Sequence, residues 1–185
     1  MPSRRVVISG VGLITPLGIG VEETWRELCA GKSGIGEITR FDTSDFQTKI
    51  AGEVKDFRPE DFLTQKDARR TTTFIAYAVA ATRMALEDSG LVIDQSNADR
   101  VGVFTGCGLG GLASLEETNR IIETRGPSRV SPFFIPMMIG NMAAGMISMQ
   151  FGAKGPNACM ATACAAGLHS IGDAFKLVQQ GRADG

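Results

Sequence analysis

Cys164 is the residue of this sequence whose type and position best suit chemistry. It lies in the run ACMATACAAGLHSIG (residues 158–172), where an apolar strand pattern gives way to a helical pattern. A helix N-terminus offers unpaired backbone N–H groups and positive potential, which favour a thiolate and can stabilise an oxyanion. Small neighbours such as Ala163 and Gly167 leave room for a substrate, and a thiol suits thioesters because exchange between thioesters is nearly isoenergetic. The pattern equally allows Cys164 to be a small, buried hydrophobic residue, which is what most free cysteines are.

The single histidine, His169, is predicted to be structural. It lies five residues after Cys164 on the expected helix, which places it roughly 140° around the axis and about 7.5 Å along it. The two side chains should therefore point to different faces. The remaining cysteines, Cys29, Cys107 and Cys159, form no zinc-binding pattern, so no metal is expected. Cys107 and Cys159 are expected to pack rather than react.

A glycine-rich run supplies a rival interpretation. Residues 106–111 (GCGLGG) follow a strand pattern and precede a helical one, which matches the G-x-G-x-x-G fingerprint of dinucleotide-binding folds. That fold needs a second strand ending in an acidic residue, whereas Glu123, near the expected spacing, lies inside the helical pattern. A dinucleotide cofactor is therefore disfavoured, and a plain tight turn is the alternative.

The charge balance limits the partners that the chain can attract. The 185 residues are 43% hydrophobic and 21% charged, with a net charge of −1, as in an ordinary globular domain with a real core. No global field favours nucleic acid or an anionic membrane, so an acidic partner would need a local basic patch. The best candidates for such a patch lie next to a helix start or in a proline-bearing loop, and they are Lys66, Arg69, Arg70 and Arg129. Each of them could equally be an ordinary solvated surface charge.

One uncharged stretch, residues 130–153, is long enough to span a bilayer. It also carries Pro132, Pro136, Asn141 and Gln150, which hydrocarbon tolerates poorly. A helix buried in a core or a subunit interface fits better, and no membrane span is expected. With no leader pattern ahead of the first strand pattern, reduced cytosolic thiols are the expectation.

The elements that position these residues alternate between strand and helix patterns. Strands are expected at 5–10, 100–106 and 157–162, and helices at 21–30, 67–89, 112–124 and 164–180. A proline-bearing loop at 126–136 leads into a further, uncharged helix that ends by residue 153, and residues 32–59 are an irregular segment with short strands. This order predicts an α/β fold with helices packed on a largely buried, mixed and mostly parallel sheet. A further strand is due where the chain stops, which suggests an incomplete unit.

Several motifs together resemble one family. T-A-C-x-x-G-x-H at 162–169 looks like the nucleophile motif of the β-ketoacyl synthases, which have the thiolase-like fold. RRVVISGVGLITPLG, FDTSDF, KDFRPEDF, GCGLGG and SPFFIP resemble the elongating synthase II group in the same order, across essentially the whole chain. The resemblance implies that residues 1–185 form the N-terminal half of such a synthase, the first βαβαβ-type repeat, and that its C-terminal half is absent.

The resemblance also implies a function. Cys164 would accept an acyl chain and condense it with malonyl-carrier protein, as a cytoplasmic, homodimeric acyltransferase of fatty acid biosynthesis. No cofactor is implied beyond the phosphopantetheine arm that arrives on the acyl carrier protein as substrate. The family's two catalytic histidines lie in the absent half, so the 185-residue chain itself is expected to be inactive in condensation.

The same resemblance assigns further roles. Leu109 would be a gate beside the acyl chain, and Phe134 and Ile135 would line the acyl pocket of the partner subunit, with ordinary core packing as their alternative. Lys66, Arg69, Arg70 and Arg129 would dock the carrier protein. The rival interpretations are a non-catalytic acyl- or carrier-binding fragment, a polyketide ketosynthase half and, last, a nucleotide-binding domain.

Overall fold

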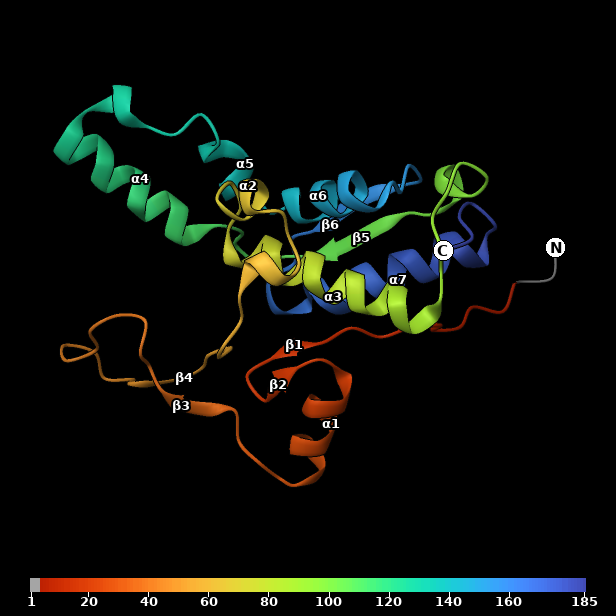
Figure 1. Ribbon diagram of the computed structural model, residues 1–185, viewed down its shortest axis with the longest axis horizontal. Coiled ribbons are helices and arrows are strands. Elements are labelled where there is room, and N and C mark those ends of the chain that lie inside the picture. Colours follow the sequence, from red (N-terminus) through yellow and green to blue (C-terminus); the bar gives the residue numbers. More distant parts are fainter. Residues whose placement is uncertain (1–3) are drawn as a thin grey trace.

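The centre of the molecule is a pair of parallel strands with helices on both faces. The computed structural model describes residues 4–185, and its strands β5 (Val103–Gly106) and β6 (Asn157–Met160) pair in register from Val103 opposite Asn157 to Gly106 opposite Met160. Side chains alternate between the faces of a strand. Asn157 bonds helix α6 (Met142–Phe151), whereas Gly106 lies against helix α7 (Ala166–Gln179), so these helices cover opposite faces (Figure 1).

The connection between the two strands is a long crossover. It runs through α4 (Leu112–Arg125), the short 3₁₀ turn η3 (Pro127–Arg129), α5 (Phe134–Met138) and α6. Figure 1 shows α4 and η3 as an arm that extends away from the strand pair, before α5 and α6 return to it. This confirms the predicted parallel pairing with a helical crossover.

Smaller elements precede the strand pair. Two antiparallel pairs, β1 (Ile14–Thr15) with β2 (Gly18–Ile19) and β3 (Ile35–Glu37) with β4 (Ile50–Gly52), form separate sheets. The other elements are α1 (Val21–Cys29), η1 (Pro59–Asp61), α2 (Gln65–Ala68), α3 (Thr73–Ser89), η2 (Ala98–Arg100) and η4 (Ala163–Ala165).

The hydrophobic core lies between α3, α6 and β5. Ile75 and Val79 of α3 are at most 1% exposed, and they belong to one buried cluster with Val103, Ala144 and Ile147. Small residues on α3 and α6 let the two helices pack closely, which explains why these alanine-rich patterns are buried rather than solvated.

Two of the predicted long helices are each divided in the structure. The pattern at 67–89 breaks after α2, because Thr72 is extended (φ −110°, ψ 164°) and its hydroxyl donates to the Met137 carbonyl at 3.1 Å. The uncharged stretch at 130–153 breaks between α5 and α6, at Ile139–Asn141. Consequently, none of the helices within residues 4–185 is long and apolar enough to cross a bilayer.

The predicted strand at 5–10 is wrong. These residues pair with no strand of the described chain, and Val7 and Ile8 are 72% and 84% exposed. Gly10 and Val11 instead lie against α3. A Cβ on Gly10 would come within 2.2 Å of the Ala85 carbonyl oxygen, and the Val11 N–H donates to an Asp88 carboxylate oxygen at 2.8 Å. A strand needs a partner for its backbone groups, and the periodicity of a sequence carries no information about whether that partner is present.

The irregular segment at 32–59 leaves large hydrophobic side chains exposed. Phe41, Phe46 and Ile50 are each more than half exposed. The two phenylalanine rings meet each other edge-on, with centroids 5.6 Å apart, rather than packing on the core.

Candidate active site

Cys164 lies on the turn between β6 and α7. It is exposed, and its neighbours Ala161 to Ala165 are exposed as well, so nothing within residues 4–185 covers the thiol. The cysteine belongs to the 3₁₀ turn η4, which leads directly into the 14 residues of α7. Helix α7 has no side-chain N-cap and no acidic residue in its first turn, and its first residue, Ala166, donates its N–H to the Ala163 carbonyl of the 3₁₀ turn. The predicted position at a strand-to-helix junction is confirmed.

The residue before the cysteine has an unusual backbone. Ala163 has φ +48°, and Asp56 is the one other non-glycine residue in the described chain with a positive φ. An L-residue in this region carries a cost of about 1–3 kcal/mol, and such residues concentrate at functional sites. At this turn the chain leaves the direction of β6, so that Cys164 lies in the 3₁₀ turn and not in the strand. No signal in the sequence marks Ala163, because glycine or asparagine is the usual residue for this conformation.

Gly106 makes close packing beneath this turn possible. A Cβ on Gly106 would lie 2.3 Å from the carbonyl atoms of Ala166 and 2.5 Å from the Gly167 nitrogen. The end of β5 therefore touches the first residue of α7 directly, and Ala166 is only 3% exposed. The small residues around the cysteine thus serve this contact as well as leaving open space beside the sulfur.

His169 ties the turn to the helix. Its Nδ1 lies 3.2 Å from the Thr162 hydroxyl oxygen, and its Nε2 lies 3.4 Å from an Asp173 carboxylate oxygen. Both ring nitrogens are thus engaged, and no hydrogen bond in residues 4–185 joins His169 to Cys164. Thr162 is the first residue of the motif at 162–169, whereas Asp173 was not singled out by the sequence, although i, i+4 spacing on the helix places it beside His169.

Leu109 reaches the same edge of the sheet as Cys164. Because β5 and β6 are parallel, the loops that follow them emerge side by side, and the Cys107 N–H continues the ladder to the Met160 carbonyl at 3.0 Å. Leu109 is 80% exposed at this edge. The loop glycines pack closely: a Cβ on Gly110 or Gly111 would lie 2.4 or 2.2 Å from the Met138 or Met137 carbonyl oxygen. This close packing explains why glycine occurs at positions 110 and 111, so a bound dinucleotide is not needed to explain it.

Phe134 and Ile135 lie elsewhere in this chain. Phe134 is half-buried and lines a separate cavity of about 250 Å³ between α4 and α5, with Ile121 and Met137. Ile135 is 53% exposed. Neither Cys164 nor Leu109 lines that cavity.

Three of the four basic candidates are neighbours. Lys66 is on α2, and Arg69 and Arg70 lie in the turn before α3; all three are exposed. The guanidinium of Arg70 sits 4.4 Å from the centroid of the Phe133 ring, which fixes that side chain by a cation–π contact. Arg129 is exposed in η3, at the outer end of the α4 arm (Figure 1).

Comparison with known proteins gives the family. Residues 3–185 match the family described as "Beta-ketoacyl synthase, N-terminal domain". The chain belongs to this family. It is 51% identical over 183 residues to the 3-oxoacyl-[acyl-carrier-protein] synthase 2 of Synechocystis sp., and 49% identical over 184 residues to that of Coxiella burnetii. The alignments cover 99% and 100% of this chain but 44% of each relative, so the chain spans less than half their length.

Solved structures show the same fold. The ishigamide ketosynthase/chain length factor superimposes with a TM-score of 0.88 and 32% identity, over 98% of this chain and 45% of that one. A β-ketoacyl synthase from Burkholderia phymatum gives a TM-score of 0.78 with 26% identity, over 96% of this chain and 44% of that one. The thiolase-like α/β fold and the resemblance to elongating synthases are thereby confirmed, as is the match to an N-terminal portion.

Proposed function

We propose that Cys164 is the acyl-accepting nucleophile of an elongating β-ketoacyl synthase of fatty acid biosynthesis. The observation that carries the proposal is the exposed thiol on a strained turn, at the start of an uncapped helix. Relatives that are 47–51% identical to this chain, from Synechocystis sp., Staphylococcus aureus and Coxiella burnetii, are 3-oxoacyl-[acyl-carrier-protein] synthases, which favours this pathway over a polyketide one. The cytoplasm is the expected location.

The proposed first step is transfer between two thioesters. The Cys164 sulfur attacks the acyl carbonyl, a C–S bond forms to Cys164, and the bond to the donor sulfur breaks. The donor leaves as a thiol that carries the proton lost by Cys164. Negative charge develops on the carbonyl oxygen in between, and the positive potential at the start of α7, which has no side-chain cap and no acidic residue in its first turn, stabilises it.

The second step needs groups that act on malonate. When malonyl-carrier protein loses carbon dioxide, the new carbanion attacks the acyl carbonyl and the C–S bond to Cys164 breaks. Cys164 leaves as a thiolate, which takes a proton from water to regenerate the thiol. His169 is held by Thr162 and Asp173, and we assign it no part in this step. The family resemblance assigns the step to two histidines beyond this chain. We therefore expect the 185 residues alone to accept an acyl group without condensing it.

Carrier docking is proposed for the basic patch of Lys66, Arg69 and Arg70, with Arg129 as a separate contact on the arm. All four side chains are exposed, and an acidic carrier would be steered toward them. A related fold has been solved as a type II PKS acyl-carrier protein in complex with its ketosynthase, at 23% identity and a TM-score of 0.82. The phosphopantetheine arm would then enter as substrate, with no further cofactor.

Leu109 and the α5 residues are proposed to contact the acyl chain. Leu109 stands beside Cys164 at the strand ends, where a side chain 80% exposed can cover or uncover the sulfur. Phe134 and Ile135 would serve the pocket of a second subunit in a homodimer, and the cavity that Phe134 lines in this chain does not include Cys164.

The test is release of thiol from a long-chain acyl thioester. Wild-type chain should release about one equivalent in a burst and then stop, because the acyl group remains on the protein. Cys164→Ala should give no burst. A burst of equal size from the alanine variant would overturn the assignment, and production of a ketoacyl product from added malonyl-carrier protein would overturn the expected lack of condensation.

A further inference from the structure

Cys107 and Cys159 lie on the same face of the strand pair. Cys159 belongs to β6 and pairs with Thr105 of β5, and Cys107 follows the end of β5, two positions beyond Thr105. The Cys107 N–H continues the ladder to the Met160 carbonyl at 3.0 Å, so the strand geometry extends to this residue. Because side chains two positions apart along a strand share a face, both thiols project to the face that carries Thr105.

Both sulfur atoms border one gap, which Gly140 leaves open. Gly140 lies between α5 and α6, and a Cβ built on it would lie 3.4 Å from the Cys107 Sγ and 3.9 Å from the Cys159 Sγ. These are ordinary contact distances, so the gap has room for a methyl-sized group in contact with both thiols. Gly140 is not among the glycines with a positive φ. Its backbone conformation therefore does not demand glycine, whereas an open gap beside the two sulfurs does.

The two sulfurs are available as ligands. Both cysteines are half-buried and free of disulfide bonds. The Cys107 Sγ accepts the Gly110 N–H at 3.1 Å, and a donor of this kind stabilises the negative charge of a thiolate. The Cys159 Sγ lies 3.9 Å from the Met160 carbonyl oxygen, the one hydrogen-bond acceptor that the structure gives it within residues 4–185.

The offset between the two positions favours a bridging ion over a direct disulfide. Neighbouring strands lie about 4.8 Å apart and rise about 3.3 Å per residue, so positions offset by two residues have Cα atoms about 8 Å apart. A disulfide needs Cα atoms about 4.4–6.8 Å apart. An ion that bonds one sulfur on each side spans a longer distance than an S–S bond does, and the gap at Gly140 is where both sulfurs can reach it.

The ligand set limits which ion can bind. Soft thiolates favour Cu(I), zinc and iron–sulfur clusters, and the latter two are usually held by four protein ligands. Within residues 4–185, no group of three or more His, Cys, Asp or Glu side chains is placed to hold a metal. Cu(I) is the soft ion that two thiolates alone can satisfy, because it accepts two sulfurs in a nearly linear arrangement.

We propose that Cys107 and Cys159 together bind one Cu(I) ion at the carboxyl ends of β5 and β6. Each thiol loses a proton as its S–Cu bond forms, so one ion displaces two protons and no electron is transferred. The Gly110 N–H bonds one of the two ligand sulfurs, so the loop that carries Leu109 is in direct contact with the site. The proposal does not depend on the function proposed for Cys164.

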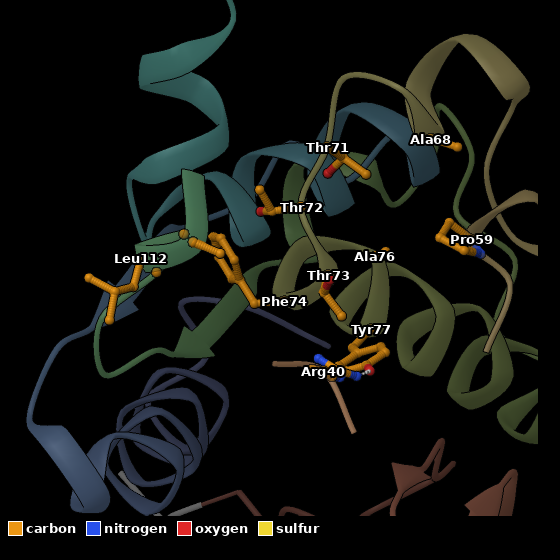
Figure 2. A pocket seen from close by; sticks show the side chains of 13 residues that line it. Arg40, Pro59, Ala68, Thr71, Thr72, Thr73, Phe74, Ala76, Tyr77 and Leu112 are labelled. Atoms are coloured by element: carbon orange, nitrogen blue, oxygen red, sulfur yellow. Dashed lines mark hydrogen bonds between the residues drawn. The ribbon is translucent and has the colours of Figure 1, made fainter. Parts of the chain in front are cut away.

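The gap is a different space from the cavity of about 560 Å³ in Figure 2. That cavity lies between the turn before α3 and the start of α4, where Thr72 and Leu112 line it, and neither Cys107 nor Cys159 is among its lining residues. Gly110 lines that cavity as well, so the glycine loop contacts both spaces. The two sulfurs, and not the cavity, are therefore the groups to test.

The test uses the Cys29→Ala/Cys164→Ala chain, which lacks the two exposed thiols and keeps Cys107 and Cys159. Cu(I) is supplied as its coloured bicinchoninate complex under anaerobic conditions, and loss of colour reports transfer to the protein. The chain should take up about one equivalent, and Cys107→Ser or Cys159→Ser in this background should abolish the uptake. Because Cu(I) is diamagnetic, amide NMR can follow the same titration, and the Gly110 amide should shift as the ion binds.

Gly140→Ala tests the gap while keeping both thiols. Its methyl group would occupy the space beside the sulfurs and should weaken Cu(I) binding by about ten- to a hundredfold, as changes beside metal ligands do. Gly108→Ala is the matched control, because a Cβ there meets nothing within 4 Å, and its affinity should equal that of the parent chain.

Three results would each overturn the proposal. The first is no Cu(I) uptake by the chain that keeps Cys107 and Cys159, or no shift of the Gly110 amide. The second is unchanged uptake after either serine substitution, and the third is equal affinity in Gly140→Ala and Gly108→Ala. Since the parent chain carries Cys164→Ala, none of these results bears on acyl transfer, and a failure of either proposal is seen separately.

Discussion

Gly106 and Ala166 are in backbone contact: a Cβ on Gly106 would lie 2.3 Å from the Ala166 carbonyl. The glycine ends β5 and the alanine begins α7, so this contact sets how closely the helix that follows Cys164 approaches the sheet.

The first prediction concerns this contact. Gly106→Ala should push α7 away from the strand, lower stability by about 1–3 kcal/mol as overpacked sites do, and slow acylation of Cys164. Gly108→Ala is the control, because a Cβ there meets nothing within 4 Å. Urea unfolding and acylation rates measure both effects; equal behaviour of the two variants would show that the contact does not position the turn.

The second prediction concerns the Thr162–His169 bond. His169→Phe removes the hydrogen bond to Thr162 and the contact with Asp173, so the turn should loosen. Acylation should slow by less than about tenfold, since one exposed hydrogen bond contributes about 0.5–1.5 kcal/mol. Cys164→Ala should abolish acylation. Complete loss of acylation in a folded His169→Phe protein would contradict the structural role and indicate a direct part in proton transfer.

The third prediction concerns pH. Hydrogen bonds from Arg100 and then Arg4 lower the pKa of Asp184 to about 2, from an ordinary value of 3.8. A carboxylate with a depressed folded-state pKa stabilises the fold above its unfolded pKa, and this stability is lost as pH falls from about 4 to about 2. Asp184→Asn should therefore flatten the loss of stability in that window. Parallel curves for wild type and variant would show that the ion pairs are not formed in solution.

The fourth prediction separates the buried core from the exposed N-terminal segment. Ile75 is 1% exposed and Ile8 is 84% exposed. Ile75→Ala should lower the free energy of unfolding by about 2–5 kcal/mol, whereas Ile8→Ala should change it by less than about 0.5 kcal/mol. A large effect at Ile8 would indicate that residues 5–10 are packed in a strand after all.

The fifth prediction concerns association of the isolated chain. Leu168, Ile171 and Phe175 form an apolar stripe along α7 that is 79%, 64% and 40% exposed. Exposed stripes of this kind favour association, so sedimentation should show concentration-dependent self-association. Leu168→Lys with Ile171→Lys should reduce it. A wild-type chain that stays a compact monomer would contradict this expectation.

Sequence patterns predicted the elements whose partners are local. The helices at 21–30 and 112–124 and the strand-to-helix junction at Cys164 are present as expected, because helix periodicity and end signals are properties of adjacent residues. The strand predicted at 5–10 is not present, because the hydrogen-bond partners of a strand must come from a distant part of the chain. The break at Thr72 depends on the Met137 carbonyl, 65 residues away, and no local pattern encodes that contact.

The candidate site was predictable to a similar extent. The cysteine and Leu109 share one edge because parallel strands end together, which the strand assignments already implied. The positive φ of Ala163 and the contact of Gly106 with Ala166 were not predictable, since both depend on how α7 docks on β5. The cavity that Phe134 lines was likewise not predictable, since it depends on how α4 packs against α5.

The most direct test of the account is to locate the acyl group by intact mass and peptide mapping after incubation with a long-chain acyl thioester. We expect one added acyl mass, on the peptide that contains Cys164, in wild type and in Cys29→Ala, which removes the other exposed thiol. Cys164→Ala should gain none. Equal acylation of Cys164→Ala, or an acyl group mapped to Cys29, would contradict the assignment of Cys164 as the nucleophile.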